Sequence, residues 1–263
     1  MDKATPPMTL LEMRDCRYVD PQSQRIIIGV LTCNKHAGRA NGVRVTWARQ
    51  LPETYRLLFL FGRPGQPPQM VGDQLFLDCP EAYEALPQKV HAFLQYCHEH
   101  FDFDYIFKTD DDTFLDLERF IGFDKQGGDY IGQFLSLENV NSAIARTWHY
   151  GKCEDKTFEK PYQRQFLCPW ATGGGYFLSR KAAQRAVSRT KANHLEHIFE
   201  DLMIGEALTR DAELNVVNLR FAEMGIVNPL LPKDMCYLRD ILLEKRLLAE
   251  QVVALERQRK VHK

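Results

Sequence analysis

The stretch Tyr105-Ile-Phe-Lys-Thr-Asp110-Asp111-Asp112-Thr-Phe114 decides how the fold of this chain is interpreted. An apolar run leads into three consecutive carboxylates, and the sequence then becomes apolar again. Like charges repel, and a buried carboxylate is costly unless it is paired. The triplet is therefore expected either as a solvated acidic turn or as a cation site at the end of a core strand. In extended backbone Asp110 and Asp112 share one side and Asp111 takes the other, an arrangement that suits Mg²⁺ or Mn²⁺ bridging to phosphate.

Apolar runs and helical segments alternate on both sides of this triplet. Continuous apolar runs at 25–32 and 55–61 have the pattern of strands buried on both faces. Further strands are predicted at 74–77, 105–110, 130–134 and 214–219, and helices at 86–100, 180–190 and 201–210. The segment 38–50 is predicted as a polar loop followed by a short helix that carries Arg44, Trp47 and Arg49. This order is typical of βαβ units, in which ligands bind beyond the carboxyl ends of the strands. The predicted fold class is α/β.

The predicted organisation is one domain with two flanking segments. Residues 1–24 are an irregular lead-in, 25–235 form the domain, and 236–263 form a charged helix. We expect this helix to pack on the domain, because its heptad pattern is too short for a coiled coil. The polar segment 135–165 is long for a loop inside a domain, which indicates a functional or a disordered segment.

Composition excludes several classes of function. The chain has 34 Lys+Arg and 35 Asp+Glu, a balance that gives no reason to expect nucleic acid or a charged membrane surface as a partner. No apolar run reaches about 18 residues, so no transmembrane helix is predicted, and the first residues lack the apolar core of a signal peptide. The seven cysteines show no CxxC spacing. Reduced thiols are therefore expected, without a zinc or redox motif. The oligomeric state is not indicated.

Two later segments carry candidate site residues. Gly173, Gly174 and Gly175 enter a predicted strand, where they allow either a ligand or another backbone to approach closely. Glu200 and Asp201 open a helix, as capping acids or as a catalytic pair. Trp170 is placed to stack on a sugar, although an aromatic residue beside a strand is more often part of the core.

Four blocks occur in an order that resembles the β-1,3-galactosyltransferase family, which also contains β-1,3-N-acetylglucosaminyltransferases and the Fringe enzymes. They are Arg44-Val-Thr-Trp47, Asp78 with residues 83–89, residues 107–114, and residues 173–179 followed by 200–205. Together they extend from about residue 26 to about residue 205. The resemblance implies a GT-A fold with a mixed central sheet and a UDP-sugar donor held by a divalent cation, usually Mn²⁺. It also implies inversion at the anomeric carbon.

The resemblance also assigns roles to residues. Asp112 is the principal metal ligand and Asp110 a second one, directly or through ribose or water. Asp201 is the base that takes the proton of the acceptor hydroxyl, as in inverting glycoside chemistry. The donor side comprises Arg44, Asp78, Lys89, Asp110 and Asp111, and the substrate side comprises Trp170, Gly173, Gly174, Gly175 and Glu200. For Arg44 and Lys89 a surface ion pair is the alternative, and for Asp78 a strand-end cap.

The predicted function is metal-dependent transfer of a hexose, galactose above all, from a UDP-sugar to a glycan acceptor in β-1,3 linkage. An N-acetylglucosaminyltransferase and a catalytically weak sugar-binding protein are the alternatives. A nucleotidyltransferase is a third, although Gly29 and Gly38 do not form the phosphate loop that it needs.

Two features depart from the family pattern. Many members have a late metal-binding His where this chain has Asn218, and His194 and His197 come too early to replace it. Weak metal binding or use of Mg²⁺ is therefore expected. The absence of an N-terminal membrane anchor favours a cytoplasmic enzyme of bacterial or viral type, with a luminal catalytic fragment as the alternative.

Overall fold

Eight strands form one mixed sheet in the computed structural model, which describes residues 23–137 and 143–227. Their order across the sheet is β3-β4-β2-β1-β5-β8-β7-β9. The strands are β1 (Ile26–Leu31), β2 (Tyr55–Gly62), β3 (Gln69–Val71), β4 (Gln74–Leu77), β5 (Tyr105–Asp110), β7 (Tyr130–Leu135), β8 (Trp170–Ser179) and β9 (Val216–Asn218). A separate two-stranded sheet pairs β6 (Phe114–Leu115) with β10 (Ile226–Val227).

Strand direction brings most of the carboxyl ends to one edge of the large sheet. Strands β4, β2, β1 and β5 are parallel, and β7 is parallel to β9. Strand β8 runs antiparallel to both β5 and β7, so it enters the sheet at the edge where β5 ends. The chain passes from β1 to β2 on one side and later returns to β5 on the other side of β1. The carboxyl ends of β1 and β5 therefore flank the switch point at which open α/β sheets bind ligands.

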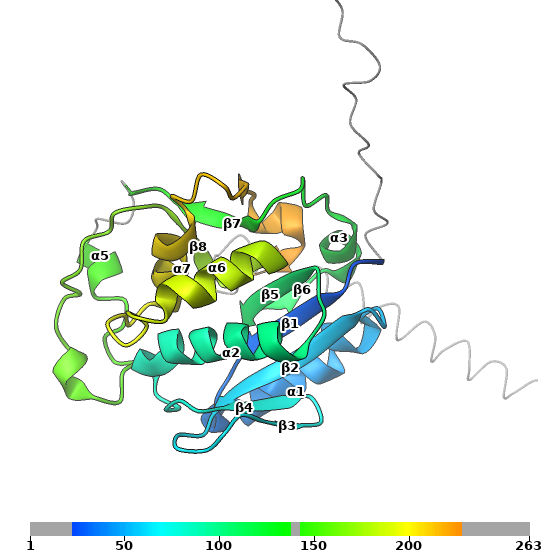
Figure 1. Cartoon of the computed structure of the whole chain (residues 1–263). Helices are drawn as coiled ribbons and strands as arrows, with labels where there is room; N and C mark the ends of the chain where they lie inside the picture. The colour runs from blue at the N-terminus through cyan, green and yellow to red at the C-terminus, as the bar shows by residue number, and fades with distance from the viewer. Residues whose placement is uncertain (1–22, 138–142, 228–263) are drawn as a thin grey trace, which may run out of the picture.

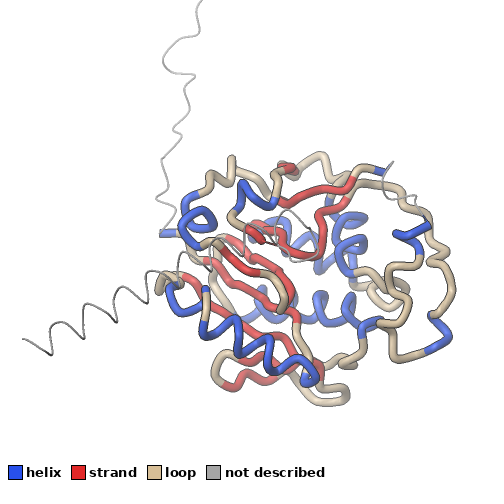
Figure 2. The backbone as a smooth tube through the Cα atoms, turned by 180° about the vertical axis from the view of Figure 1, so that it is seen from behind, coloured by secondary structure: helices blue, strands red, loops and turns tan. Residues whose placement is uncertain are grey.

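Helices cover both faces of the sheet, as Figures 1 and 2 show from opposite sides. One face carries α2 (Leu86–His100), α6 (Arg180–Thr190) and α7 (Glu200–Leu208), which pack against one another. The other carries α1 (Ala37–Val45) and α3 (Leu117–Gly122) with the short 3₁₀ turns η3 (Trp47–Gln50) and η6 (Phe221–Met224). The remaining short helices are α5 (Ala143–Arg146) and the 3₁₀ turns η2 (Asn34–His36), η4 (Tyr83–Ala85) and η5 (Lys156–Phe158).

The core explains why β1 must be an unbroken apolar strand. All six of its residues are buried, because helices cover both faces of the sheet. Gly29 lies where the ring of Phe93 in α2 crosses the strand, and a Cβ added there would come within 2.4 Å of that ring. A glycine in the middle of this strand therefore lets α2 pack directly on the sheet.

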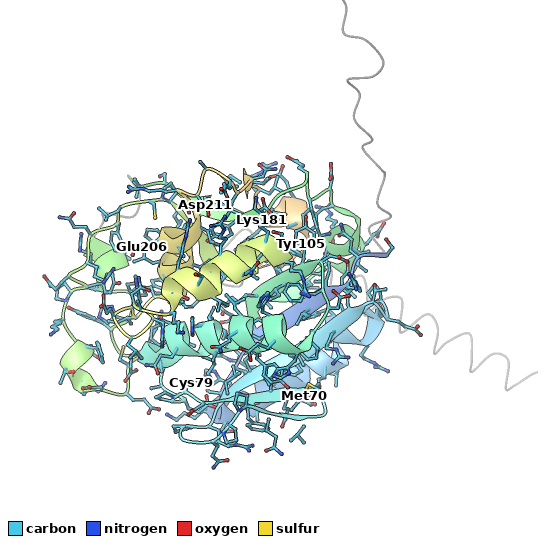
Figure 3. All side chains as sticks on the ribbon, viewed as in Figure 1. Met70, Cys79, Tyr105, Lys181, Glu206 and Asp211 are labelled. Carbon is cyan, nitrogen blue, oxygen red and sulfur yellow. The ribbon has the colours of Figure 1, made fainter. Side chains whose placement is uncertain are left out.

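The side chains of α6 fix it to the turn that follows α7. Arg189 pairs with the buried Asp211 at 2.8 Å, and the Lys181 ammonium donates to the carbonyl of Glu213. Figure 3 labels Lys181 and Asp211 near this helix. These contacts stabilise the position of α7, whose first turn carries two of the candidate site residues.

The structure confirms the predicted α/β class and the predicted strands and helices within the described residues. The segment 38–50, expected as a polar loop and then a short helix, is helical from its start, where α1 is followed by η3. The elements β3, β6, β10 and α3 are short ones that the sequence pattern did not indicate. The predicted C-terminal helix and all but the end of the predicted lead-in lie outside the described residues, so the domain boundaries remain predictions.

Two of the expectations drawn from composition can be compared with the described part of the chain. Its five cysteines, Cys33, Cys79, Cys97, Cys153 and Cys168, are all free thiols. A search of these residues for a bilayer-spanning helix, sufficiently long and apolar, finds none.

The buried ammonium of Lys125 has no hydrogen-bond partner among residues 23–137 and 143–227. The ammonium of Lys125 is buried among the rings of Tyr105, Phe123 and Phe177, and burial lowers its pKa to about 8. The nearest of these ring centroids, that of Phe123, is 4.6 Å away. Because the unfolded chain still binds this proton above pH 8, the stability of the wild type should rise from about pH 8 toward pH 10.5.

We therefore predict that Lys125→Met stabilises the protein at pH 7. The free energy of unfolding should increase by at most about 3 kcal/mol. This is the cost of keeping a lysine charged when burial lowers its pKa by roughly two. Urea unfolding at pH 7 and pH 10 measures the increase, and the difference between variant and wild type should shrink at the higher pH. Lys156→Met, at an exposed lysine, should change stability little at either pH. A destabilised Lys125→Met at pH 7 would contradict the prediction.

Candidate active site

Lys108 lies at the centre of the cluster of charges beyond the end of β5. Its side chain is 1% exposed. The ammonium contacts Asp110 Oδ1 at 2.9 Å, the carbonyl oxygen of Gly173 at 2.7 Å, and Glu200 Oε1. Burial lowers the pKa of Lys108, but the charges of Asp110 and Glu200 outweigh this effect and raise it overall. One ammonium group therefore joins β5, the start of β8 and the start of α7.

Asp111 points to the other side of β5, as the alternation of a strand requires. Its buried carboxylate accepts hydrogen bonds from the Thr32 hydroxyl at 2.9 Å and from Arg39 at 3.2 Å, and the imidazole of His36 lies 3.3 Å away. These three partners follow β1. Asp111 thus binds the segment after β1 to the end of β5.

Lys89, in α2, also stabilises the segment that follows β1. Its buried ammonium donates to the carbonyl oxygen of Thr32 at 2.9 Å and to Glu81 at 2.8 Å. The contacts place Lys89 behind the end of β1, where it orients the threonine whose hydroxyl binds Asp111. In the ion pair with Glu81, the lysine side chain is almost completely buried. The surface ion pair named as the alternative for Lys89 would instead expose it.

Asp112 is the member of the triplet with the fewest contacts. Its side chain is 37% exposed, and the only ion-pair partner in the described part of the chain is Arg39, at 3.8 Å. Partial burial and the charges of Asp110 and Asp111 raise the pKa of Asp112. A carboxylate whose ionised form is disfavoured by its neighbours gains from an added cation. Asp112 is therefore the triplet carboxylate most available to a ligand.

Glu200 and Asp201 occupy the first turn of α7 but have different surroundings. Glu200 is 5% exposed, binds Lys108 and accepts the Tyr176 hydroxyl at 2.8 Å. Burial raises the pKa of Glu200 to about 7. Asp201 accepts the backbone N–H of Gly173 at 3.1 Å and that of Leu202 at 2.8 Å. Burial also raises the pKa of Asp201. Asp201 is partly exposed and forms no ion pair with another described residue, so it is the less constrained of the two acids.

The start of β8 passes between these acids because Gly173 has no side chain. A Cβ at this position would lie 3.2 Å from Glu200 Oε1, 3.4 Å from Lys108 Nζ and 3.5 Å from Asp201 Oδ2. The next carbonyl, that of Gly174, accepts the hydroxyls of Thr109 at 2.7 Å and Thr113 at 3.0 Å. The glycine run therefore lets charged side chains and two threonine hydroxyls come close to the backbone of β8.

The structure places four predicted site residues outside this cluster. Arg44 forms a two-point ion pair with Asp73, at 2.6 and 2.8 Å, and its guanidinium lies 4.2 Å from the ring centroid of Phe59. Asp78 accepts the backbone N–H of Gly65 at 2.6 Å and follows β4, three strand positions or roughly 14 Å from β5.

Trp170 and Gly175 lie in the core. Trp170 is buried, and its Cβ lies 2.3 Å from where a Cβ on Gly205 would be, so α7 packs directly on it. A Cβ on Gly175 would come within 2.8 Å of Phe107 and 3.0 Å of Ile226. Trp170 fills the space between β8 and α7, and the missing side chain of Gly175 leaves room for Phe107 and Ile226.

Sequence reasoning missed Arg39, Lys108 and Tyr83. Arg39 lies five residues before Arg44, on the part of α1 nearest the end of β1, where it reaches Asp111. Lys108 lies two residues before Asp110, so the period of a strand does indicate that the two side chains share a face. Burial raises the pKa of Tyr83, and the charges of Asp201 and Asp110 add to this effect. Tyr83 packs against the apolar cluster that contains Phe199 and Leu202, which flank the two acids of α7 in the sequence.

No group of three or more His, Cys, Asp or Glu residues suited to a metal ion occurs among residues 23–137 and 143–227. Asn218, at the position where a late His is expected, uses its side-chain oxygen to accept the backbone N–H of Phe134 at 3.0 Å. That contact lies where the register of β7 shifts against β8. Asn218 thus supports the sheet. His197 is buried and lies 3.3 Å from the Tyr162 hydroxyl.

The sequence profile of the family described as galactosyltransferase matches residues 39–220 of this chain. Among individual proteins, the chain is 29% identical over 136 residues to the zebrafish protein named UDP-GalNAc:beta-1,3-N-acetylgalactosaminyltransferase 2. That match covers 51% of this chain and 26% of the zebrafish protein.

Two mammalian proteins are similar as well. The chain is 27% identical over 252 residues to human N-acetyllactosaminide beta-1,3-N-acetylglucosaminyltransferase 4, covering 84% of this chain and 61% of the human protein. It is 30% identical over 118 residues to mouse beta-1,3-galactosyltransferase 6, covering 41% of this chain and 32% of the mouse protein. The chain thus spans only part of the length of each of these three relatives.

The central ion pair leads to a prediction about stability. Lys108→Met leaves the buried Glu200 and the adjacent Asp110 without their cation and should destabilise the protein by about 3–5 kcal/mol. The pKa of Glu200 is raised above its ordinary 4.5 to about 7, so its contribution to stability is present below pH 4.5 and is lost as the pH rises through 7. The destabilisation should therefore be larger at pH 8 than at pH 5.

Urea unfolding of wild type and Lys108→Met at these two pH values measures the effect. The double variant Lys108→Met/Glu200→Gln should recover part of the loss at pH 8, because the buried carboxylate of Glu200 is gone, although that of Asp110 remains without its cation. A loss that is equal at both pH values would show that Glu200 does not titrate as described.

Proposed function

The chain belongs to the galactosyltransferase family, and from this premise we propose that it is an inverting glycosyltransferase. It transfers a hexose from a UDP-sugar to a hydroxyl group of a glycan acceptor, forming a β-1,3 linkage. The observation that carries the proposal is the contact of Lys108 with Asp110 and Glu200 at the switch point of the sheet, which joins the acidic triplet to the start of α7, where Asp201 lies. The names of the related proteins, which are β-1,3-transferases of galactose, N-acetylglucosamine or N-acetylgalactosamine, support the reaction class.

Asp201 acts as the general base in this proposal. It takes the proton from the acceptor hydroxyl while the hydroxyl oxygen forms a bond to the anomeric carbon of the donor. The bond from that carbon to the diphosphate oxygen breaks on the opposite face, and UDP leaves with the electron pair. Burial raises the pKa of Asp201, which makes its carboxylate a stronger base, and two backbone N–H groups fix its orientation.

The donor-side residues fit a divalent cation, Mn²⁺ or Mg²⁺. Asp112 is exposed, has like-charged neighbours and would be the principal ligand, with Asp110 beside it. Asp110 Oδ1 already binds Lys108, so the protein offers few oxygens, and the diphosphate would supply most of the others. When bound, such an ion supplies a Lewis acid for the charge that develops on the leaving diphosphate.

Galactose is the donor sugar that we propose first, because the family profile carries that description. N-Acetylglucosamine is the second candidate, since the human relative that covers most of this chain is named for it. The relatives named above come from vertebrates, which favours the lumen of the secretory pathway over the cytoplasm as the site of action.

Release of UDP from a panel of UDP-sugars, with Mn²⁺ and with EDTA, tests the function. Wild type should release UDP from one sugar nucleotide. Asp201→Asn should bind that donor normally but lose about 100-fold or more in transfer rate, because the base is gone and the shape is kept. Asp112→Ala should lose metal-dependent donor binding as well as turnover.

Thermal protection by UDP-sugars separates the possible failures. If no UDP-sugar raises the unfolding temperature of wild type, the donor assignment fails. If Asp201→Asn transfers at a near-normal rate, Asp201 is not the base. Donor binding without turnover in wild type, on any acceptor tested, would favour the catalytically weak binding protein.

A pair of arginine variants tests which end of α1 faces the donor. Arg39→Ala should weaken UDP binding about tenfold, because it removes a charged donor beside Asp111 and Asp112. Arg44→Ala should lower thermal stability by breaking the pair with Asp73 but leave UDP affinity unchanged. Calorimetric titration with UDP measures both affinities. The opposite ranking would return Arg44 to the donor site.

A further inference from the structure

The segment 148–155, here called the clamp loop, is tied to the edge of the sheet where the acids lie. The carboxylate of Glu84 in η4 accepts the backbone N–H groups of Glu154 at 3.1 Å and Asp155 at 2.8 Å. Lys35, in η2 after β1, pairs with the carboxylate of Glu154 at 2.6 Å. The clamp loop is thus anchored to the two 3₁₀ turns η2 and η4, which lie on either side of the Thr32–Lys89 contact.

This anchoring holds Lys152 toward the acidic cluster. The ammonium of Lys152 lies 3.7 Å from the ring centroid of Trp148 and 5.5 Å from that of Tyr83. Tyr83 is the residue whose phenol is influenced by the charges of Asp201 and Asp110. Burial against the rings lowers the pKa of Lys152, and the charges of Asp110 and Asp112 act in the opposite direction. Lys152 is therefore within electrostatic reach of both proposed metal ligands.

Among the described residues, no carboxylate lies within ion-pair distance of the Lys152 ammonium. Each of the other four cations around the cluster pairs with at least one carboxylate. Lys35 pairs with Glu154, Lys89 with Glu81, Lys108 with Asp110 and Glu200, and Arg39 with Asp111. Lys152 instead lies on aromatic rings, which attract an ammonium group but do not neutralise it. It is the one of these five cations that can take an anionic ligand without first breaking an ion pair.

The balance of charge indicates which ligand that is. Five carboxylates gather here, from Asp110, Asp111, Asp112, Glu200 and Asp201, against the bound cations Lys108 and Arg39. A diphosphate brings further negative charge into a region that already repels it, so it needs cations beyond one metal ion. A lysine is a compact point charge well suited to phosphate oxygens.

We propose that Lys152 leaves the ring of Trp148 and binds the diphosphate of the donor nucleotide, so that the clamp loop forms one wall of the donor site. This proposal rests on the proposed function, because it concerns the same donor. When the diphosphate is absent, the ammonium lies against the rings of Trp148 and Tyr83. The clamp loop then contributes a positive charge to the donor site. This gives a function to part of the polar segment 135–165.

Titration with UDP and with uridine tests the proposal, because the two ligands share the base and ribose and differ in the diphosphate. Lys152→Gln should weaken UDP binding about tenfold, the loss of one charged hydrogen bond, and leave uridine binding unchanged. Lys152→Arg should restore most of the UDP affinity. Calorimetry measures UDP, and competition measures uridine, each with Mn²⁺ and with EDTA.

Lys156→Gln is the matched control, since Lys156 follows the clamp loop, is exposed and pairs with Glu159. It should bind both ligands as wild type does. The proposal is overturned if Lys152→Gln binds UDP as wild type does. It is also overturned if the variant loses UDP and uridine affinity equally, because Lys152 would then only hold the loop in place. Failure of wild type itself to bind UDP would instead overturn the donor assignment, and this proposal with it.

Discussion

The contact on which the site depends is the buried ammonium of Lys108, held by Asp110, Glu200 and the carbonyl of Gly173. A buried charge is tolerated only when its partners are complete. The three partners belong to the end of β5, the start of α7 and the start of β8, so these elements cannot move independently. The position of Asp201 follows directly, because it adjoins Glu200 and accepts the N–H of Gly173.

The same contact explains why three adjacent aspartates can coexist in the folded chain. Asp110 is compensated by Lys108 and Asp111 by Arg39 together with the Thr32 hydroxyl. The side chain of Asp112 is about as exposed as that of Asp110, but among the described residues its ion-pair partner is the more distant Arg39. The triplet therefore does not act as a single anionic patch. Two of its carboxylates hold β5 to its neighbours, and the third remains for a ligand. Because the structural pair is satisfied internally, a ligand at Asp112 need not disturb the sheet.

Much of this arrangement could be predicted from the sequence, and the exceptions have physical causes. Strands β1 and β2 were predictable because burial on both faces requires apolar runs, and β5 was predictable from the shorter apolar run 105–107 that leads into the triplet. The junction of the triplet with Glu200 and Asp201 was predictable from the order of the family's blocks. Whether Arg39 or Arg44 faces the site was not, since both lie on a short helix and only tertiary packing shows that Asp73 holds Arg44. Trp170 is of a residue type that stacks on sugars, but Gly205 lets α7 pack directly on it and bury it.

Charge also explains why the chain uses a loop, and not the sheet, to complete the site. Four cations surround these acids, and each of them is bound to an acid: Lys35, Arg39, Lys89 and Lys108. A further positive charge placed on the sheet would pair with one of those acids and be lost to the ligand. Lys152 avoids this because the clamp loop holds it on the rings of Trp148 and Tyr83, where no carboxylate competes within ion-pair distance among the described residues. Aromatic rings near an acidic centre thus keep a cation available that direct contact with the acids would neutralise.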